Sequence, residues 1–98
     1  MTKISSEQAI QIAQEGYQSK HYKQATRILQ RLVQHGVQDG RIYLLMGNVH
    51  YRLAKYQLAT QAYLNGMQID TNSAMLHANL GNAYVQQGLY GSAIDSYI

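Results

Sequence analysis

Residues 80–90 read LGNAYVQQGLY, and residues 46–56, 34 positions earlier, read MGNVHYRLAKY. The shift of 34 residues superimposes the paired positions Gly47/Gly81, Asn48/Asn82, Tyr56/Tyr90, Ala59/Ala93 and Tyr63/Tyr97 without a gap. The same frame reaches the N-terminal third of the chain, where Tyr22 and Ala25 match Tyr56 and Ala59. A fixed period of this length is the mark of a helical repeat protein.

The period divides the chain into three units, at residues 6–39, 40–73 and 74–98. Each unit is predicted to form two helices joined by a tight turn. In the third unit Leu76, Leu80 and Ala83 recur at helical spacing, and Gly88 ends the first helix. Ser5 with Gln8 predicts a capping box, while Asp39 and either Asn72 or Ser73 are candidate N-caps. There is no proline, and strand-like runs of Val, Ile and Thr are missing.

The strings Met46-Gly47-Asn48 and Leu80-Gly81-Asn82-Ala83-Tyr84, with the tyrosines and alanines that follow them, resemble the tetratricopeptide repeat family. The resemblance covers residues 6–98 and is strongest in the third unit. It implies an all-α fold, a right-handed superhelical array of antiparallel helix hairpins with about 2.7 repeats in one domain. The small residues Ala13, Gly47 and Gly81 would let the first helix of each unit approach its partner closely.

The third unit is incomplete, because its second helix runs only from about Tyr90 to Ile98. Tyr97 and Ile98 would lack a following helix to cover them. Two explanations stay open: the chain is a fragment of a longer array, or its open C-terminal end packs on another chain.

Composition narrows the function classes. The absence of cysteine excludes disulfides and thiol chemistry. No segment approaches the ~18–20 apolar residues of a membrane span, and residues 1–6 lack a signal-peptide core, so we expect no membrane insertion and a cytoplasmic location. All eight Lys and Arg residues lie in the first 55 residues, which also contain three acids and so have a net charge of +5. The cations are scattered over several helix positions. We therefore expect no nucleic-acid binding and only a mild preference for acidic partners.

The sequence predicts no catalytic residue, no metal ligand and no cofactor, and hence no enzyme. No two of the four histidines have the i, i+4 spacing of a helical metal pair. His50 and His77 occupy positions where other units have tyrosine, so they are read as packing residues. The five acids form no catalytic pair, and no glycine-rich loop matches a phosphate cradle.

The resemblance implies that the first helices of the units line a concave groove that holds an extended peptide. Carrying the frame over gives these groove residues: Gln14, Tyr17, Arg41, Asn48, Tyr51, Arg52, Asn82 and Gln86. An amide donates and accepts at once, so a ladder of Gln14, Asn48 and Asn82 suits a peptide backbone. Tyr17 and Tyr51 offer rigid contact area, and Arg41 and Arg52 could pair with an acidic side chain. The plainer alternative is that these amides and tyrosines serve the fold alone.

The leading interpretation is a non-catalytic scaffold that binds an extended protein segment. The chain is similar to the helical-repeat chaperones of bacterial secretion systems, and also to repeat arrays fused to larger proteins, including glycosyltransferases and pilus-assembly factors. A further alternative is therefore the N-terminal repeat region of a larger enzyme such as a glycosyltransferase. The family's clamp for acidic C-terminal tails is absent, because Ile10, Ala78 and Asn82 stand where cations are required. The second interpretation is an oligomerisation scaffold that self-associates through the exposed C-terminal end without a groove ligand.

Overall fold

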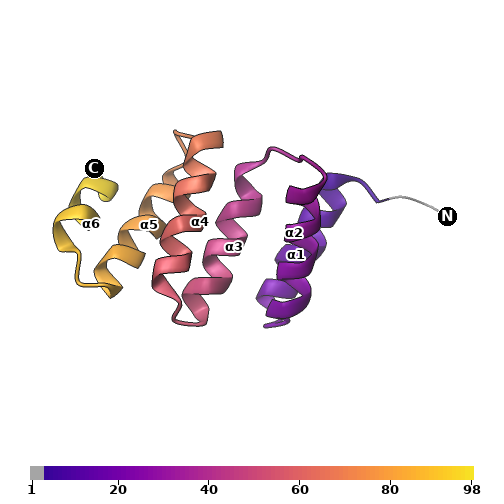
Figure 1. Cartoon of the computed structure of the whole chain (residues 1–98), viewed down its shortest axis with the longest axis horizontal. Helices are drawn as coiled ribbons and strands as arrows, with labels where there is room; N and C mark the ends of the chain where they lie inside the picture. The colour runs from indigo at the N-terminus through magenta and orange to yellow at the C-terminus, as the bar shows by residue number, and fades with distance from the viewer. Residues whose placement is uncertain (1–3) are drawn as a thin grey trace.

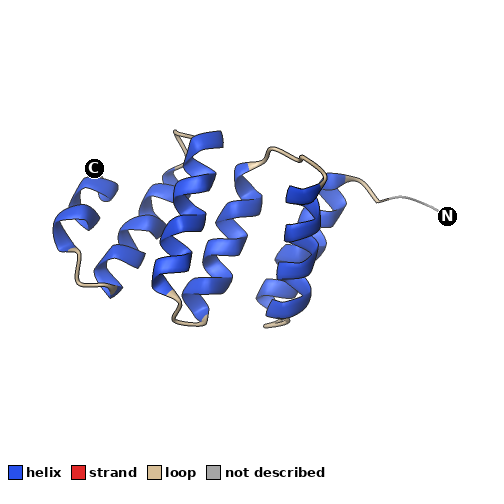
Figure 2. Ribbon diagram, viewed as in Figure 1, coloured by secondary structure: helices blue, strands red, loops and turns tan. Residues whose placement is uncertain are grey.

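The computed structural model describes residues 4–98, which form six α-helices joined by short turns (Figures 1 and 2). The helices pair as hairpins in chain order: α1 (Ser6–Gln18) with α2 (Tyr22–Gln34), α3 (Gly40–Arg52) with α4 (Tyr56–Ile69), and α5 (Ala74–Gln86) with α6 (Tyr90–Tyr97). The described residues contain no strand. The all-α fold of stacked helix hairpins expected from the repeat is confirmed.

The first helix of each hairpin begins at a side-chain cap. Ser5 and Gln8 form the predicted capping box, in which each side chain bonds the backbone N–H of the other residue. Asp39 caps α3 by accepting from the N–H of Arg41, and Ser73 rather than Asn72 caps α5. These caps satisfy backbone donors that a helix start leaves without partners.

The turn inside each hairpin contains one residue in the left-handed region, at the same place in each unit. Lys20 has φ 65°, Ala54 has φ 59° and Gly88 has φ 75°. Only glycine adopts this conformation without a steric penalty from Cβ. The third unit therefore has the residue that the turn geometry favours, and the first two units keep the turn at a local cost.

The hairpins stack side by side into an elongated array of 51 × 25 × 18 Å, with the described chain ends at opposite ends of its long axis (Figure 1). Helix α3 contacts both α1 and α5, so these three helices form one continuous layer. Helices α2, α4 and α6 pack against it as the second layer, and α2 and α4 also contact the next hairpin. No helix among the described residues is long and apolar enough to cross a membrane.

The core consists of two clusters of buried side chains that cross the hairpin boundaries. One joins the first hairpin to α3 and contains Ala9, Ile10, Ala13, Leu29, Leu32, Ile42 and Leu45. The other joins α4 to α5 and contains Ala59, Tyr63, Leu76, Leu80 and Ala83. Because each cluster takes residues from two hairpins, each hairpin depends on its neighbour for burial.

Glycine at positions 47 and 81 permits the closest approach between helices of one hairpin. A Cβ atom at Gly47 would overlap the ring of Tyr63, and one at Gly81 would overlap the ring of Tyr97. The expectation that small residues allow close packing is confirmed. The tyrosine ring fills the space left by the missing side chain, and its hydroxyl group passes beyond the glycine toward the face formed by α1, α3 and α5.

Candidate functional site

A hollow of about 310 Å³ opens among α1, α3 and α5, with one residue of α4 reaching into it. Its lining residues are Tyr17, Asn48, Tyr51, Arg52, Tyr63, Asn79 and Asn82. We call it the tyrosine–asparagine hollow. The lining is formed almost entirely by uncharged hydrogen-bonding side chains and tyrosine rings, and Arg52 is its only charged residue.

Asn48 is the hydrogen-bonding centre of this hollow. Its Oδ1 atom accepts from the hydroxyl of Tyr63 at 2.6 Å and from Nδ2 of Asn79 at 3.0 Å. With its acceptor engaged twice, the amide has its Nδ2 donors left for a ligand. Asn79, whose donor is engaged by Asn48, keeps its own oxygen as an acceptor.

The third unit repeats part of this arrangement. The hydroxyl of Tyr97 donates to Oδ1 of Asn82 at 2.5 Å, which again leaves the amide nitrogen of the asparagine as the available donor. Two side-chain donors, from Asn48 and Asn82, therefore stand one repeat apart along the hollow. Burial raises the pKa of Tyr63 well above its usual value, so its hydroxyl stays protonated and keeps donating.

Tyr17 and Tyr51 form one edge of the hollow, and each is held by a tyrosine of the second helix in its own hairpin. The ring centroids of Tyr17 and Tyr22 lie 5.9 Å apart, and those of Tyr51 and Tyr56 lie 5.3 Å apart in an edge-to-face arrangement. Aromatic pairs at these distances attract one another. The two rings thus present pre-positioned apolar surface to anything bound in the hollow.

Arg52 is fixed at the rim by Tyr17. Its Nε atom donates to the Tyr17 hydroxyl at 3.0 Å, which raises the pKa of Arg52 further above its usual value. Within residues 4–98, no carboxylate lies within ion-pair distance of this guanidinium. Its two terminal nitrogens are therefore free to meet a ligand carboxylate.

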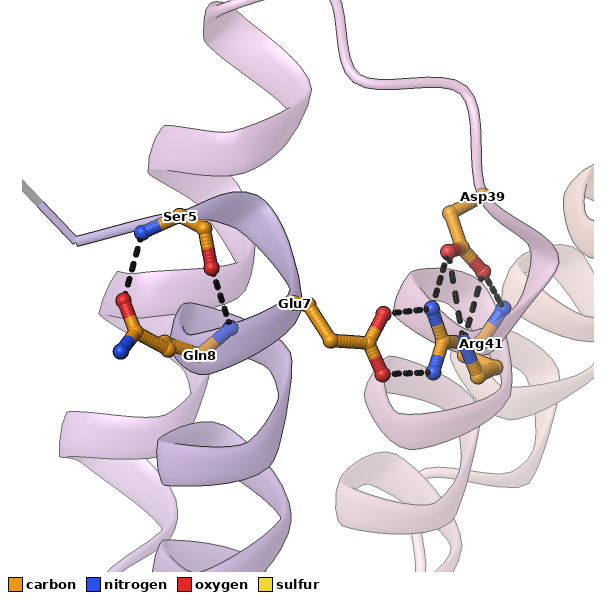
Figure 3. Close-up of polar contacts among 5 residues, drawn as sticks. All are labelled: Ser5, Glu7, Gln8, Asp39 and Arg41. Atoms are coloured by element: carbon orange, nitrogen blue, oxygen red, sulfur yellow. Dashed lines mark hydrogen bonds and ion pairs between the residues drawn. The ribbon is translucent and has the colours of Figure 1, made fainter.

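Arg41 is placed differently, as Figure 3 shows: it lies between two carboxylates. Its two terminal nitrogens donate to both oxygens of Glu7 at 2.8 and 2.7 Å, and its other edge faces Asp39. Hydrogen bonds from Arg41 hold the pKa values of both acids below their usual ranges and raise that of the guanidinium. The cation expected to meet an acidic ligand is therefore occupied by the chain's own acids.

A second hollow of about 340 Å³ lies beside this ion pair on the face of α1. Its lining residues are Glu7, Ile10, Gln11, Gln14, Glu15, Gln18 and Arg41. We call it the α1 hollow. Of the eight predicted groove residues, five line the tyrosine–asparagine hollow (Tyr17, Asn48, Tyr51, Arg52 and Asn82), two line the α1 hollow (Gln14 and Arg41), and Gln86 lines neither.

Sequence reasoning missed Tyr63 and Asn79, which the structure places in the hollow. Tyr63 lies on a second helix, and the expected groove was built from first helices alone. One signal could have found it: an asparagine followed 15 positions later by a tyrosine occurs twice, as Asn48 with Tyr63 and as Asn82 with Tyr97. In the first unit Gln14 and Leu29 stand at these positions, so no equivalent bond forms there.

The histidines show no common site. His77 is half-buried and its Nε2 atom lies 2.8 Å from the carbonyl of Thr71, whereas His35 bonds the carbonyl of Arg31. His50 is also half-buried, and its Nδ1 atom is enclosed without a hydrogen-bond partner. Within residues 4–98, no group of three His, Asp or Glu side chains is arranged to hold a metal ion.

Comparison with solved structures identifies chaperones of bacterial secretion as similar folds. The translocator chaperone SycD of type III secretion in Yersinia enterocolitica, described in one structure as an alternative dimer, superimposes with a TM-score of 0.86 and 26% identity over 97% of this chain and 74% of SycD. PcrH, solved in complex with the chaperone-binding region of PopB, superimposes with a TM-score of 0.86 and 24% identity over 98% of this chain and 80% of PcrH. No protein-family model and no curated protein sequence matches the chain.

Proposed function

We propose that this chain is a non-catalytic, chaperone-like scaffold that holds an extended segment of a partner protein against α1, α3 and α5. The observation that carries the proposal is the pair of oriented amide donors on Asn48 and Asn82, one repeat apart in a hollow edged by tyrosine rings. An extended peptide presents backbone carbonyls at regular intervals, and such donors suit them regardless of side-chain sequence.

The character of the hollow supports binding rather than catalysis. Its lining contains no histidine, aspartate or glutamate, the side chains that most often act as general bases. Tyrosine and arginine are the residue types that carry most energy at protein interfaces. The structural likeness to SycD, a translocator chaperone, and to PcrH, which was solved with a segment of PopB, points to the same class of function.

A peptide-display experiment tests the proposal. Random peptides of about 12 residues are selected against the immobilised chain. At ~3.3 Å per residue, an extended peptide of this length can cross α1, α3 and α5. Binding of the selected peptides is then measured by fluorescence anisotropy for the wild type and for the variant Asn48→Ala/Tyr51→Ala/Arg52→Ala. We expect the groove variant to lose about tenfold or more in affinity.

The matched control is Gln24→Ala/Arg27→Ala/Gln30→Ala, three exposed positions on α2 outside both hollows. Urea unfolding of each variant separates a loss of binding from a loss of fold. Unchanged peptide affinity in a folded groove variant would show that this face is not the binding site.

A second candidate function is self-association through α6. Tyr90, Ile94 and Tyr97 are 64%, 57% and 50% exposed, whereas Tyr63, the counterpart of Tyr97 on α4, is 1% exposed because α5 covers it. Exposed apolar stripes of this kind favour association. A dimer of SycD is among the similar structures.

Sedimentation equilibrium tests the second candidate. If α6 mediates association, Ile94→Lys should shift the chain toward monomer, while Leu58→Lys, at a residue 52% exposed on α4, should leave the mass unchanged. A wild-type chain that sediments as a monomer up to several hundred micromolar excludes this function.

A further inference from the structure

The two hollows on the face formed by α1, α3 and α5 carry opposite charge. Glu7, Glu15 and Arg41 are the charged residues of the α1 hollow, with Asp39 directly behind Arg41. Three acids and one cation give this end of the face a net charge of −2. Arg52 alone gives the tyrosine–asparagine hollow a net charge of +1.

The negative end cannot be neutralised by its own arginine. Arg41 already contacts two carboxylates, so each acid shares the guanidinium and one negative charge remains on that trio. Glu15, two helical turns along α1 from Glu7, is exposed, and no hydrogen bond or ion pair involves its carboxylate within the described residues. A cationic group entering the α1 hollow would therefore find an unpaired carboxylate and a half-compensated one.

The positive end is equally open. Arg52 donates to Tyr17 through Nε, and neither Nη1 nor Nη2 of its guanidinium makes a hydrogen bond or ion pair with a described residue. A planar guanidinium edge binds a carboxylate through two parallel hydrogen bonds. The tyrosine hydroxyl fixes the side chain in place, so less rotamer freedom is lost when a carboxylate binds.

We propose that the groove selects a segment with two opposite charges in fixed order: a carboxylate that meets Arg52 and, toward the first hairpin, a lysine, arginine or free amino group that meets Glu15 and Glu7. This inference rests on the proposed function of the same face. It sharpens the expectation of an acidic partner, because a uniformly acidic segment would be repelled at the α1 hollow.

The spacing of the two charges follows from the packing. Packed helices lie ~8–10 Å apart and an extended chain advances ~3.3 Å per residue, so the charges should be about three residues apart. Uncharged residues between them would lie over the tyrosine pair and near the Asn48 amide. The pattern is directional, so it also fixes which way the segment runs across the helices.

The selected peptides from the display experiment provide the test. We expect an Asp or Glu and a Lys or Arg at this separation to be enriched in one order only. Arg52→Glu and Glu15→Lys should each weaken such a peptide about two- to fivefold, the range of an exposed ion pair, and the effect should shrink in high salt. Arg27→Glu on α2 and Asp95→Lys on α6, both exposed and outside the two hollows, are the charge-matched controls.

Charge exchange gives the decisive comparison. The double variant Arg52→Glu/Glu15→Lys should prefer a peptide in which the two charges are interchanged. Selected peptides that need the groove but show no charge order, and that bind both charge variants like wild type, would overturn this inference and leave the proposed function intact. Peptides whose binding survives the triple groove variant would overturn both.

Discussion

The hydroxyl of Tyr63 on α4 donates to Oδ1 of Asn48 on α3, with 2.6 Å between the two oxygens. The ring reaches this position because residue 47 is glycine, whose missing Cβ leaves the ring its place. A core residue that is 1% exposed thus sets the orientation of an amide in the candidate groove. Packing in the core and the orientation of this amide are therefore linked through one hydrogen bond, and the effect of that bond can be measured.

Tyr63→Phe removes only that hydroxyl. We expect the free energy of unfolding to fall by about 1 kcal/mol, because the partly buried Oδ1 atom of Asn48 then accepts one hydrogen bond instead of two. Peptide affinity should fall as well, since the Asn48 side chain is then free to turn. Tyr97→Phe is the matched control: it removes the equivalent bond to Asn82 at a residue 50% exposed, and should cost less stability. Both quantities come from urea unfolding and anisotropy; equal stability losses for the two variants would contradict the role assigned to burial.

Ala54→Gly should stabilise the chain. Ala54 has φ 59° in the turn between α3 and α4, where Gly88 stands in the third unit with φ 75°. Relief of the left-handed strain, offset by the greater freedom of glycine in the unfolded chain, predicts a gain of about 0.5–1 kcal/mol. Gly88→Ala should produce a loss of similar size. Thermal and urea unfolding measure both changes, and a destabilising Ala54→Gly would show that the turn is not strained.

The ion pair of Arg41 with Glu7 and Asp39 predicts a loss of stability in acid. Both carboxyl pKa values are depressed in the folded chain, so the unfolded chain binds protons first as the pH falls. The contribution of the ion pair to the free energy of unfolding is complete above about pH 5. It is lost as the pH falls from about 4.3 through the lowered pKa values. Arg41→Gln should make the free energy of unfolding depend less on pH in this acidic range. Arg27→Gln, at an exposed α2 residue outside the ion pairs, should leave it unchanged, and identical acid profiles for all three proteins would exclude the ion pair as its cause.

Much of the fold could be predicted from the repeat frame, since period, caps and small residues are local in sequence. Ser5 and Asp39 cap the helices that follow them, as the pattern indicates, and α5 ends two residues before Gly88. The alternative between Asn72 and Ser73 could not be decided, because both residue types cap helices equally well.

The candidate site was harder to predict because its details depend on contacts between units. Glu7 and Arg41 occupy the same repeat position 34 residues apart, so the frame aligned them but did not reveal that they would bind each other. Asn79 was absent from the expected groove, and its one-repeat counterpart, Leu45, is a buried core residue that gives no signal for a groove position. Side-chain partners across units are set by three-dimensional proximity, which a one-dimensional frame does not contain.

His50 predicts a second pH dependence, at mildly acidic pH. Burial, with a smaller contribution from the charge of Lys55, lowers the pKa of its imidazole. The enclosed Nδ1 atom also lacks a neighbouring acceptor that could take a hydrogen bond from an added proton. The unfolded chain therefore takes up the proton first, so stability falls as the pH drops from about 6.5 toward the lowered pKa. The third unit has Tyr84 at this position, half-buried like His50.

His50→Tyr should remove this slope while keeping a ring at the site. The measurement is the free energy of unfolding at pH 7.5 and pH 5.2, taken for the wild type, His50→Tyr and the control His21→Gln at an exposed position. Contributions from the rest of the chain are common to the wild type and His50→Tyr, and so cancel in their difference. We expect the variant to lose less stability than the wild type between the two pH values, and His21→Gln to follow the wild type. If His50→Tyr retains the wild-type slope, the half-buried imidazole is not its source.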